Sequence, residues 1–133
     1  MREYARQQTA RLVRRLALAL NRAARDVDAQ SIHDVRVAMR RLSRCLRTFA
    51  PFYPDGSWKK IRRRISALMA AAGAVRDCDI AIELAGQAGV SRGTDVVRQL
   101  EEQRRKTGHG LLLEIRRWKS RDLVRKWQSR LGL

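Results

Sequence analysis

The sequence predicts an all-α protein, an antiparallel helical bundle of about six helices. Three observations carry this prediction. Apolar residues recur at helical spacing, Ala, Leu and Arg dominate the composition, and the two prolines stand close together at positions 51 and 54. No connection is long enough to separate two domains, so residues 1–133 are read as one unit. The predicted helices cover residues 3–25, 31–49, 58–72, 76–85, 94–119 and 120–130.

The first two helices are bounded by polar and proline-containing segments. The first begins near Glu3 and ends near Arg25, where DVDAQS interrupts the pattern. Ser31 is predicted to cap the second helix, with Asp34 three residues later as its capping-box partner. This helix ends near Phe49, because APFYPDGS contains both prolines and cannot continue it.

The later helices are bounded by serine, threonine and glycine. Ser57 is predicted to cap the third helix, and Gly73 to break or bend the chain before the fourth. The fourth helix stops at GQAGVSRGT, and Thr94 starts the fifth. TGHG, at 107–110, lies inside the fifth helix and either kinks it or lets a neighbouring helix approach closely. Ser120 is predicted to cap the last short helix.

The charge balance points to a polyanionic partner. The chain has 30 Lys and Arg against 13 Asp and Glu, which gives a net charge of +17. A hydrophobic content of 44% separates it from disordered polycations. Because self-repulsion of this size costs stability, we expect an anion to compensate it. Nucleic acid, an anionic membrane surface and a condensed phosphate polymer are the candidates.

Cysteine usage and hydropathy predict a cytoplasmic protein without metal or cofactor. Cys45 and Cys78 lie within helical patterns, with no ligand spacing around them, and are interpreted as reduced packing thiols. The N-terminal segment lacks the long apolar stretch of a signal peptide. No apolar run approaches the ~18 residues of a membrane span.

The second helix carries a basic stripe opposite its apolar face. On a wheel of ~100° per residue, one arc of roughly 80° collects His33, Arg36, Arg40, Arg44 and Arg47. Like charges at i,i+4 oppose helix formation, so an external anion explains the stripe better than solvation does. Arginine also grips phosphate oxygens with two parallel hydrogen bonds. Arg41 lies off the stripe, so we expect Arg40→Glu to weaken binding more than Arg41→Glu.

Other helices contribute further basic candidates. Arg11 and Arg15 share a line on the first helix, and Lys59 and Arg63 align on the third beside small residues. Arg104 interrupts the apolar stripe of the fifth helix. Because a buried unpaired arginine is very costly, Arg104 either meets an acid or faces a water-filled, anion-binding groove.

Two motifs resemble those of a known family. HDVRVAMRRLSRCLRTF is similar to the signature H-x-x-R-V-x-x-R-R-L-R of the CHAD domain, the conserved-histidine α-helical domain, with Ser43 as a departure. AAGAVRDCDI resembles the second CHAD motif, L-G-x-x-R-D-x-D-V, with Ala72 in place of Leu. Together the motifs extend the resemblance over nearly the whole chain.

The resemblance implies an all-helical fold whose full domain holds two four-helix bundles around a basic groove or pore. On the same resemblance, that groove would bind inorganic polyphosphate without catalysis, and such binding can place family members on polyphosphate granules. His33, Arg36, Arg40 and Arg44 would inherit the anion-binding role, together with positions such as Lys59 and Arg63 on the third helix. Arg76 and Asp77, in the second motif, are interpreted as an ion pair that fixes a helix start.

The chain carries one copy of each motif and therefore resembles a half-domain. A symmetric homodimer would rebuild the two-bundle groove, because a twofold axis can replace internal pseudo-symmetry. A lone bundle with one open basic face is the other possibility. The dimer is the favoured interpretation.

Three other functions are less consistent with the sequence than polyphosphate binding. Nucleic-acid binding is the main alternative, but aromatic residues are only 5%, and Trp58, Trp118 and Trp127 stand in core registers. Catalysis on phosphates usually requires metal-binding carboxylates, and Asp77 and Asp79 do not share a helix face. Membrane-surface binding would need apolar surface that the core already uses.

Overall fold

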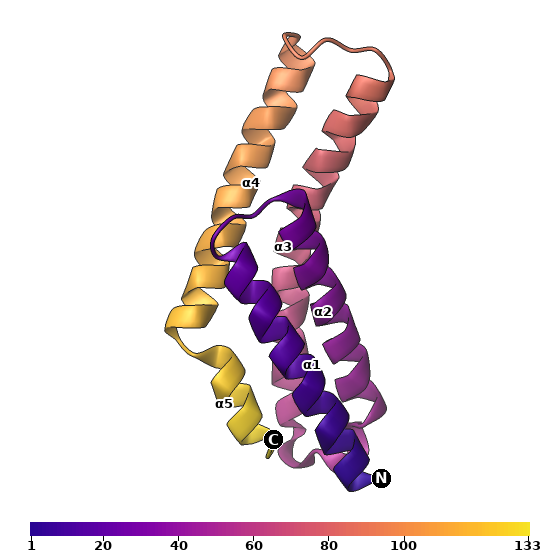
Figure 1. The fold of residues 1–133 in the computed structure, drawn as a ribbon, viewed down its shortest axis with the longest axis vertical. Coiled ribbons are helices and arrows are strands. Elements are labelled where there is room, and N and C mark those ends of the chain that lie inside the picture. Colours follow the sequence, from indigo (N-terminus) through magenta and orange to yellow (C-terminus); the bar gives the residue numbers. More distant parts are fainter.

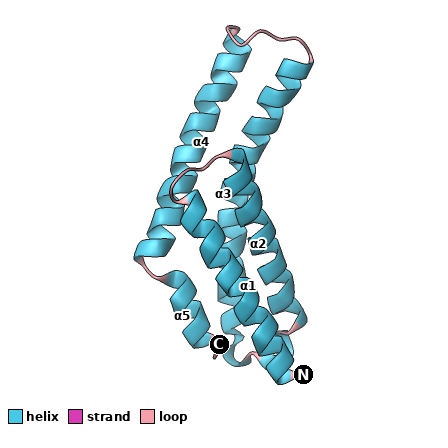
Figure 2. Cartoon of the chain, viewed as in Figure 1, coloured by secondary structure: helices cyan, strands magenta, loops and turns pink.

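The fold consists of helices joined by short loops (Figures 1 and 2). A computed structural model describes the backbone of residues 1–133 and every side chain except that of Pro54. The α-helices are α1 (Arg2–Ala23), α2 (Ala29–Thr48), α3 (Ser57–Gln87), α4 (Asp95–Ser120) and α5 (Leu123–Arg130), with two 3-10 turns, η1 (Ala50–Phe52) and η2 (Pro54–Gly56). The described backbone contains no strand, and the all-α prediction is confirmed.

The helices form two antiparallel hairpins packed on each other. α1 pairs with α2, α3 pairs with α4, and α2 lies against α3 to join the hairpins. α5 folds back against α4 and α1, so that the C-terminus ends in the same half of the molecule as the N-terminus (Figure 1). The core draws on all five helices, and its largest fully buried side chains include Leu16, Leu20, Met39, Leu42, Leu46, Ile61, Ile65, Leu68, Leu111, Ile115 and Trp127.

The predicted third and fourth helices are one helix. The expectation that Gly73 breaks the chain was wrong, because α3 continues through it to Gln87. Glycine inside a helix costs only about 1 kcal/mol relative to alanine. Ala72 and Val75, on either side, are completely buried and hold the helix in place. Packing therefore outweighs the local preference, and the chain has five α-helices in place of about six.

Threonine and serine act differently at the ends of α4. Thr94 caps this helix as predicted, since its side chain accepts a hydrogen bond from Val97 N at 3.4 Å. Ser120 does not cap the next helix: it ends α4, and its Oγ donates to the Arg117 carbonyl oxygen at 3.0 Å. α5 instead begins after Asp122, whose φ of 52° makes the turn.

A buried hydroxyl cluster ties the α2–α3 connection to the start of α1. The hydroxyls of Thr9 and Tyr53 hydrogen-bond each other, and Thr9 Oγ1 also donates to the Ala5 carbonyl oxygen at 2.8 Å. Cys45 Sγ lies 3.5 Å from Thr9 Oγ1. Burial raises the pKa of both the Cys45 thiol and the Tyr53 hydroxyl. Both groups therefore stay neutral and serve packing.

The α3–α4 hairpin extends well past the α1–α2 loop, so that one end of the molecule is two helices thick (Figure 1). The other end contains α1, α2 and α5 together with the remaining halves of α3 and α4. Among the described helices, none is long and apolar enough to cross a membrane.

Candidate polyanion-binding site

The start of α2 places the basic stripe. Asp28, not Ser31, is the N-cap: its carboxylate accepts a hydrogen bond from Ser31 N at 2.8 Å. This bond holds the pKa of Asp28 below its usual range. Ser31 is buried and donates from Oγ to the Asp26 carbonyl oxygen at 2.7 Å, while Asp34 accepts from Gln30 Nε2 at 2.9 Å. The predicted capping box was therefore wrong, and α2 begins two residues earlier.

The α1–α2 groove brings basic residues of both helices together. This hollow of about 340 Å³ is lined from α1 by Arg15 and Arg22, and from α2 by His33 and Arg41. All four side chains are exposed to solvent. The structure thus joins two predicted residues, Arg15 and His33. The only acid in the lining is Asp34, which already accepts the amide of Gln30.

The α2–α3 groove, on the other flank of α2, holds a second pair of predicted residues. Arg40 and Arg44 line a hollow of about 320 Å³ together with Ser66 and the apolar side chains of Met39 and Met69. The helical wheel placed Arg40 and Arg44 in one stripe with His33. In the structure the stripe runs along the ridge between the two grooves. His33 lines the α1–α2 groove, whereas Arg40 and Arg44 line the α2–α3 groove.

The other predicted residues of α1, α2 and α3 do not line either groove. Arg36 is half-buried, and its Nε has no hydrogen-bond partner among the described atoms. Lys59 lies over the ring of Trp58, with Nζ 5.6 Å from the ring centroid. The exposed members of this set are Arg11, Arg47, Lys59 and Arg63.

The arginines of α2 are free of acidic partners. Within the described residues, no ion pair engages Arg36, Arg40, Arg41, Arg44 or Arg47. Four of the ion pairs that do form join residues three apart on the chain. The cations of α2 are thus available to an external anion. No acidic side chain among the described residues pairs with them to reduce their mutual repulsion.

Arg104 meets an acid, which settles the alternatives posed by its position. Its Nε donates to Asp79 Oδ1 at 3.0 Å, and its Nη2 donates to the Val27 carbonyl oxygen at 2.6 Å. The side chains of Arg104 and Asp79 are 22% and 21% exposed. Arg104 therefore clamps α3, α4 and the α1–α2 loop together. Its contact with an anion remains a prediction, but two of its hydrogen bonds are already used inside the chain.

Gly108 makes room for this clamp. A Cβ at Gly108 would collide with Nη1 of Arg104 and would touch the side chain of Val27. α4 runs without a break through TGHG, so these glycines do not end the helix. The close approach that the sequence suggested is made by the Arg104 side chain and by the α1–α2 loop.

In the second motif, AAGAVRDCDI, the residue that forms an ion pair is Asp79. Arg76 and Asp77 lie in the middle of α3, where no helix starts, and the described residues show no ion pair between them. The interpretation of this pair as a helix-start lock was wrong. Asp79, two residues later, makes the structural ion pair instead, because its side chain turns inward to Arg104.

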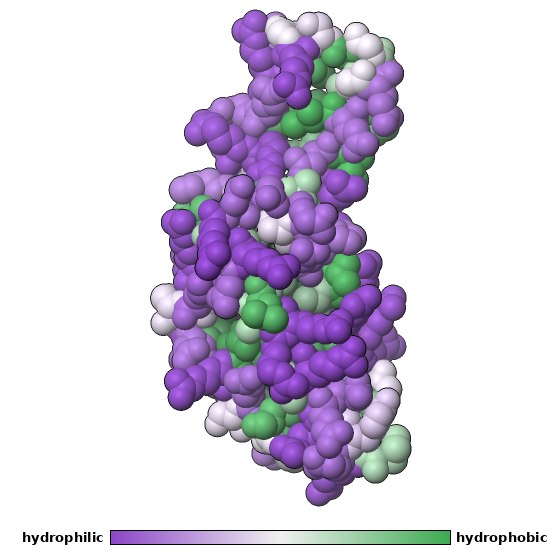
Figure 3. Space-filling model, in the orientation of Figure 1, coloured by the Kyte–Doolittle hydropathy of each residue, from purple (hydrophilic) through white to green (hydrophobic). Residues whose placement is uncertain are grey.

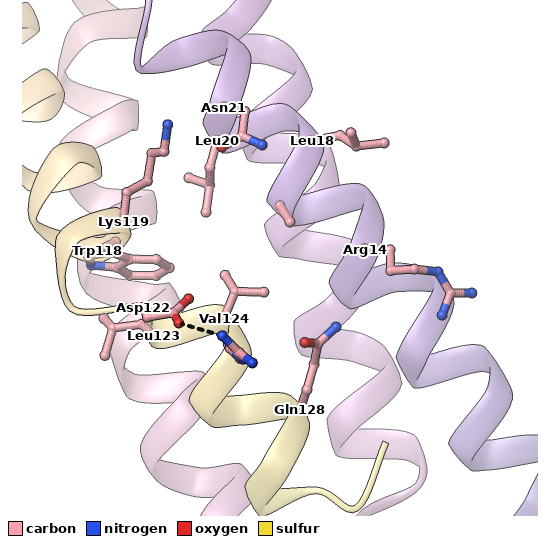
Figure 4. A pocket seen from close by; sticks show the side chains of 12 residues that line it. Arg14, Leu18, Leu20, Asn21, Trp118, Lys119, Asp122, Leu123, Val124 and Gln128 are labelled. Atoms are coloured by element: carbon pink, nitrogen blue, oxygen red, sulfur yellow. Dashed lines mark ion pairs between the residues drawn. The ribbon is translucent and has the colours of Figure 1, made fainter.

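A larger hollow lies elsewhere and suits a phosphate chain less well. It has a volume of about 600 Å³ and opens between α1, α5 and the end of α4 (Figure 4). Leu18, Leu20 and Val124 supply apolar surface, with the cations Arg14 and Lys119 at other positions in its lining. None of the ten predicted binding residues contributes to it.

Sequence reasoning missed Arg41 and left Arg22 out of the binding set. On the wheel Arg41 falls beside the stripe, and only the packing of α1 against α2 makes that flank a groove. A signal was present: Arg41 follows His33 by eight residues, which places it about 80° away on the same helix. The flank could be chosen only with the position of α1 known.

The fold and the unpaired arginines define an all-α bundle with a polycationic face. Comparison with protein families agrees with the motifs: the family model described as the CHAD domain matches residues 3–132. The chain belongs to the CHAD family. No curated protein and no solved structure matches it.

Proposed function

We propose that this protein binds inorganic polyphosphate, without catalysis, through the α1–α2 groove and the adjoining ridge of α2. The observation that carries the proposal is the convergence of Arg15, Arg22, His33 and Arg41 from two helices on one hollow. Since the arginines of α2 have no carboxylate partners within the described residues, an external anion is their missing counterion.

Polyphosphate fits this surface chemically. It is a flexible, unbranched chain with a charge on every unit and no base to be read. Guanidinium groups bind such oxygens through paired, charge-assisted hydrogen bonds. Binding would release counterions, so the affinity should fall steeply as salt is added. The CHAD family is known for polyphosphate binding, which supports the same ligand for this member.

Nucleic acid is the second candidate, because a basic face attracts any polyanion. The tryptophan side chains do not favour it. Trp118 and Trp127 are 4% and 2% exposed and stack edge to face on each other, with ring centroids 5.1 Å apart. Trp58 is half-buried against the core. Single-stranded nucleic acid would need exposed rings for base stacking.

The positions of the carboxylates support a binding role without catalysis. Of the two aspartates weighed as metal ligands, Asp79 is engaged by Arg104, while Asp77 is exposed. The experiment is a colorimetric assay of phosphate release from polyphosphate, with and without Mg²⁺. Metal-dependent release by the purified chain would overturn the non-enzymatic part of the proposal.

The proposal includes a homodimer in which a second chain completes the binding surface, and recruitment of the protein to polyphosphate granules through that surface. Both follow from the single copy of each motif and from the family's ligand. Co-localisation of a fluorescent fusion with granules, lost on depletion of polyphosphate, would test the second point.

The decisive experiment is a titration with long-chain polyphosphate at several salt concentrations. Arg41→Gln and Arg15→Gln should weaken binding several-fold, whereas Arg98→Gln, an equal charge change at an exposed position on α4, should leave it nearly unchanged. Arg40→Gln tests the α2–α3 groove in the same way. Equal losses in all four variants would indicate diffuse attraction and refute a defined groove.

A competition experiment separates the two candidate ligands. Excess polyphosphate should displace a fluorescent oligonucleotide from the protein, and saturating polyphosphate should raise the melting temperature, since a ligand that binds only the folded state stabilises it. An oligonucleotide that stays bound would favour nucleic acid.

A further inference from the structure

The projecting end of the α3–α4 hairpin, residues 76–110, lacks a third layer. We call it the arm. The main hydrophobic core includes Val75 and Leu111, the residues that flank the arm, but none within it. Inside the arm the only buried hydrophobic side chains are those of Cys78 and Val97. Apart from the α1–α2 loop, which Arg104 holds at its base, the arm stands as two helices alone (Figure 1).

The arm exposes an unusual share of large aliphatic side chains. Ile80, Leu84, Val90 and Val96 are 37%, 58%, 37% and 60% exposed, and they make up half of the large hydrophobic residues exposed among the described side chains. Figure 3 shows hydrophobic atoms reaching the surface at this projecting end. Amphipathic helices normally bury such residues against another element.

Two of the exposed side chains lie on one side of α3, which we call its outer side. Leu84 follows Ile80 by four residues within the helix. A spacing of four places both side chains on the same side of the helix. Together they supply apolar area that a second helix could bury.

The distribution of charge favours a second copy of this chain as the occupant of this surface. The arm holds six of the 30 Lys and Arg and six of the 13 Asp and Glu, so the entire net charge of +17 lies outside it. Two copies therefore repel each other everywhere except at their arms. Charges farther apart than the Debye length, about 8–10 Å in physiological salt, contribute little to that repulsion.

We propose that two chains dimerise through their arms, with the outer side of α3 packed against its own counterpart across a twofold axis. Ile80 and Leu84 would lie at the centre of the contact. The inference gives a dimer interface that is separate from the basic face, and it rests on the arm alone and not on the proposed function or the identity of the anion. The basic grooves lie outside the arm and stay open to a ligand.

Sedimentation equilibrium of the full chain without polyphosphate tests the proposal. As the protein concentration rises from about 1 to 100 µM, a range that covers micromolar dissociation constants, the measured mass should approach twice 15.3 kDa. A wild-type chain that keeps its helical circular dichroism and stays monomeric at every concentration overturns the proposal.

Two arm variants and one matched control locate the contact. Leu84→Glu and Ile80→Glu place charges on the outer side of α3 and should weaken dimerisation by roughly 100-fold or more, because each substitution occurs twice in a symmetric interface. Leu113→Glu, at a position 47% exposed on α4 outside the arm, should dimerise like wild type. Dimerisation that survives Leu84→Glu, or is lost equally in Leu113→Glu, refutes the arm interface.

The same variants distinguish this inference from the proposed function. A monomeric Leu84→Glu chain that still binds polyphosphate through a single groove would uphold the arm interface and show that one chain suffices for binding. Wild-type dimers that fail to bind polyphosphate would support the arm interface and refute polyphosphate as the ligand.

Discussion

The contact between Gly108 and Arg104 leads to a prediction in which the same substitution has opposite effects in two backgrounds. Nη1 of Arg104 occupies the space that a Cβ at position 108 would need. The guanidinium is not free to move aside, because Nε and Nη2 are bonded to Asp79 and to the Val27 carbonyl oxygen at 3.0 and 2.6 Å. Gly108→Ala must therefore displace a bonded group.

The expected magnitudes follow from these contacts. Alanine stabilises a helix interior by about 1 kcal/mol relative to glycine. A displaced guanidinium loses at least one charge-assisted hydrogen bond, about 2–3 kcal/mol. Gly108→Ala should thus destabilise the wild-type chain by about 1–2 kcal/mol. Arg104→Ala removes both bonds and leaves Asp79 without its partner, at a cost of about 3 kcal/mol. In that background Gly108→Ala should stabilise by about 1 kcal/mol.

Urea unfolding followed by circular dichroism at 222 nm measures all four corners of this double-mutant cycle. Gly110→Ala is the matched control: it lies two residues away on α4, and a Cβ there meets nothing within 4 Å. It should stabilise both backgrounds equally. If Gly108→Ala stabilised the wild-type chain as much as Gly110→Ala does, the account of the clamp would be refuted.

Two further predictions concern the helices themselves. Since the Ser31 N–H bond lowers the pKa of Asp28, the stability from this cap is complete above the ordinary aspartate pKa of about 3.9 and disappears as the pH falls through the lowered value. Asp28→Asn keeps a capping side chain without the titration, so its stability should fall less between pH 5 and 2; parallel losses in both chains would contradict the assignment. Gly73→Ala should raise the melting temperature by about 2–4 °C, because a Cβ there meets nothing within 4 Å and helix propensity improves. A lower melting temperature would mean that Gly73 serves packing that the structure does not show.

The helices with strong apolar periodicity could be predicted from sequence, whereas several of their boundaries could not. In the sequence, Gly73 looks like a helix breaker. The burial of its neighbours, which keeps the helix intact, is visible only in the structure. Asp28 and Ser31 are both good capping residues, and the choice depends on Ser31 being drawn inward to the Asp26 carbonyl oxygen. Such choices depend on tertiary packing, which local propensity does not contain.

For the candidate site, the residues of the basic face could be predicted from the sequence. Which groove each residue lines could not. A helical wheel sorts the residues of α2 by angle, and it correctly separated the core side from the charged side. A helical wheel represents a single helix and does not include the neighbouring helices. His33 and Arg40, adjacent on the wheel, therefore line different grooves, and Arg41 joins His33. Pairing between helices needs the three-dimensional structure.

The ion pairs of the described residues divide into four local ones, each within three residues, and one that joins distant segments, Arg104 with Asp79. Long-range electrostatics therefore takes little part in specifying how the helices are arranged. A surface of this kind can change its charges during evolution with little penalty to the architecture. The arginines of α2 can therefore change in number and spacing while the bundle beneath them stays the same, so the charge of this face and the fold can evolve separately in this chain.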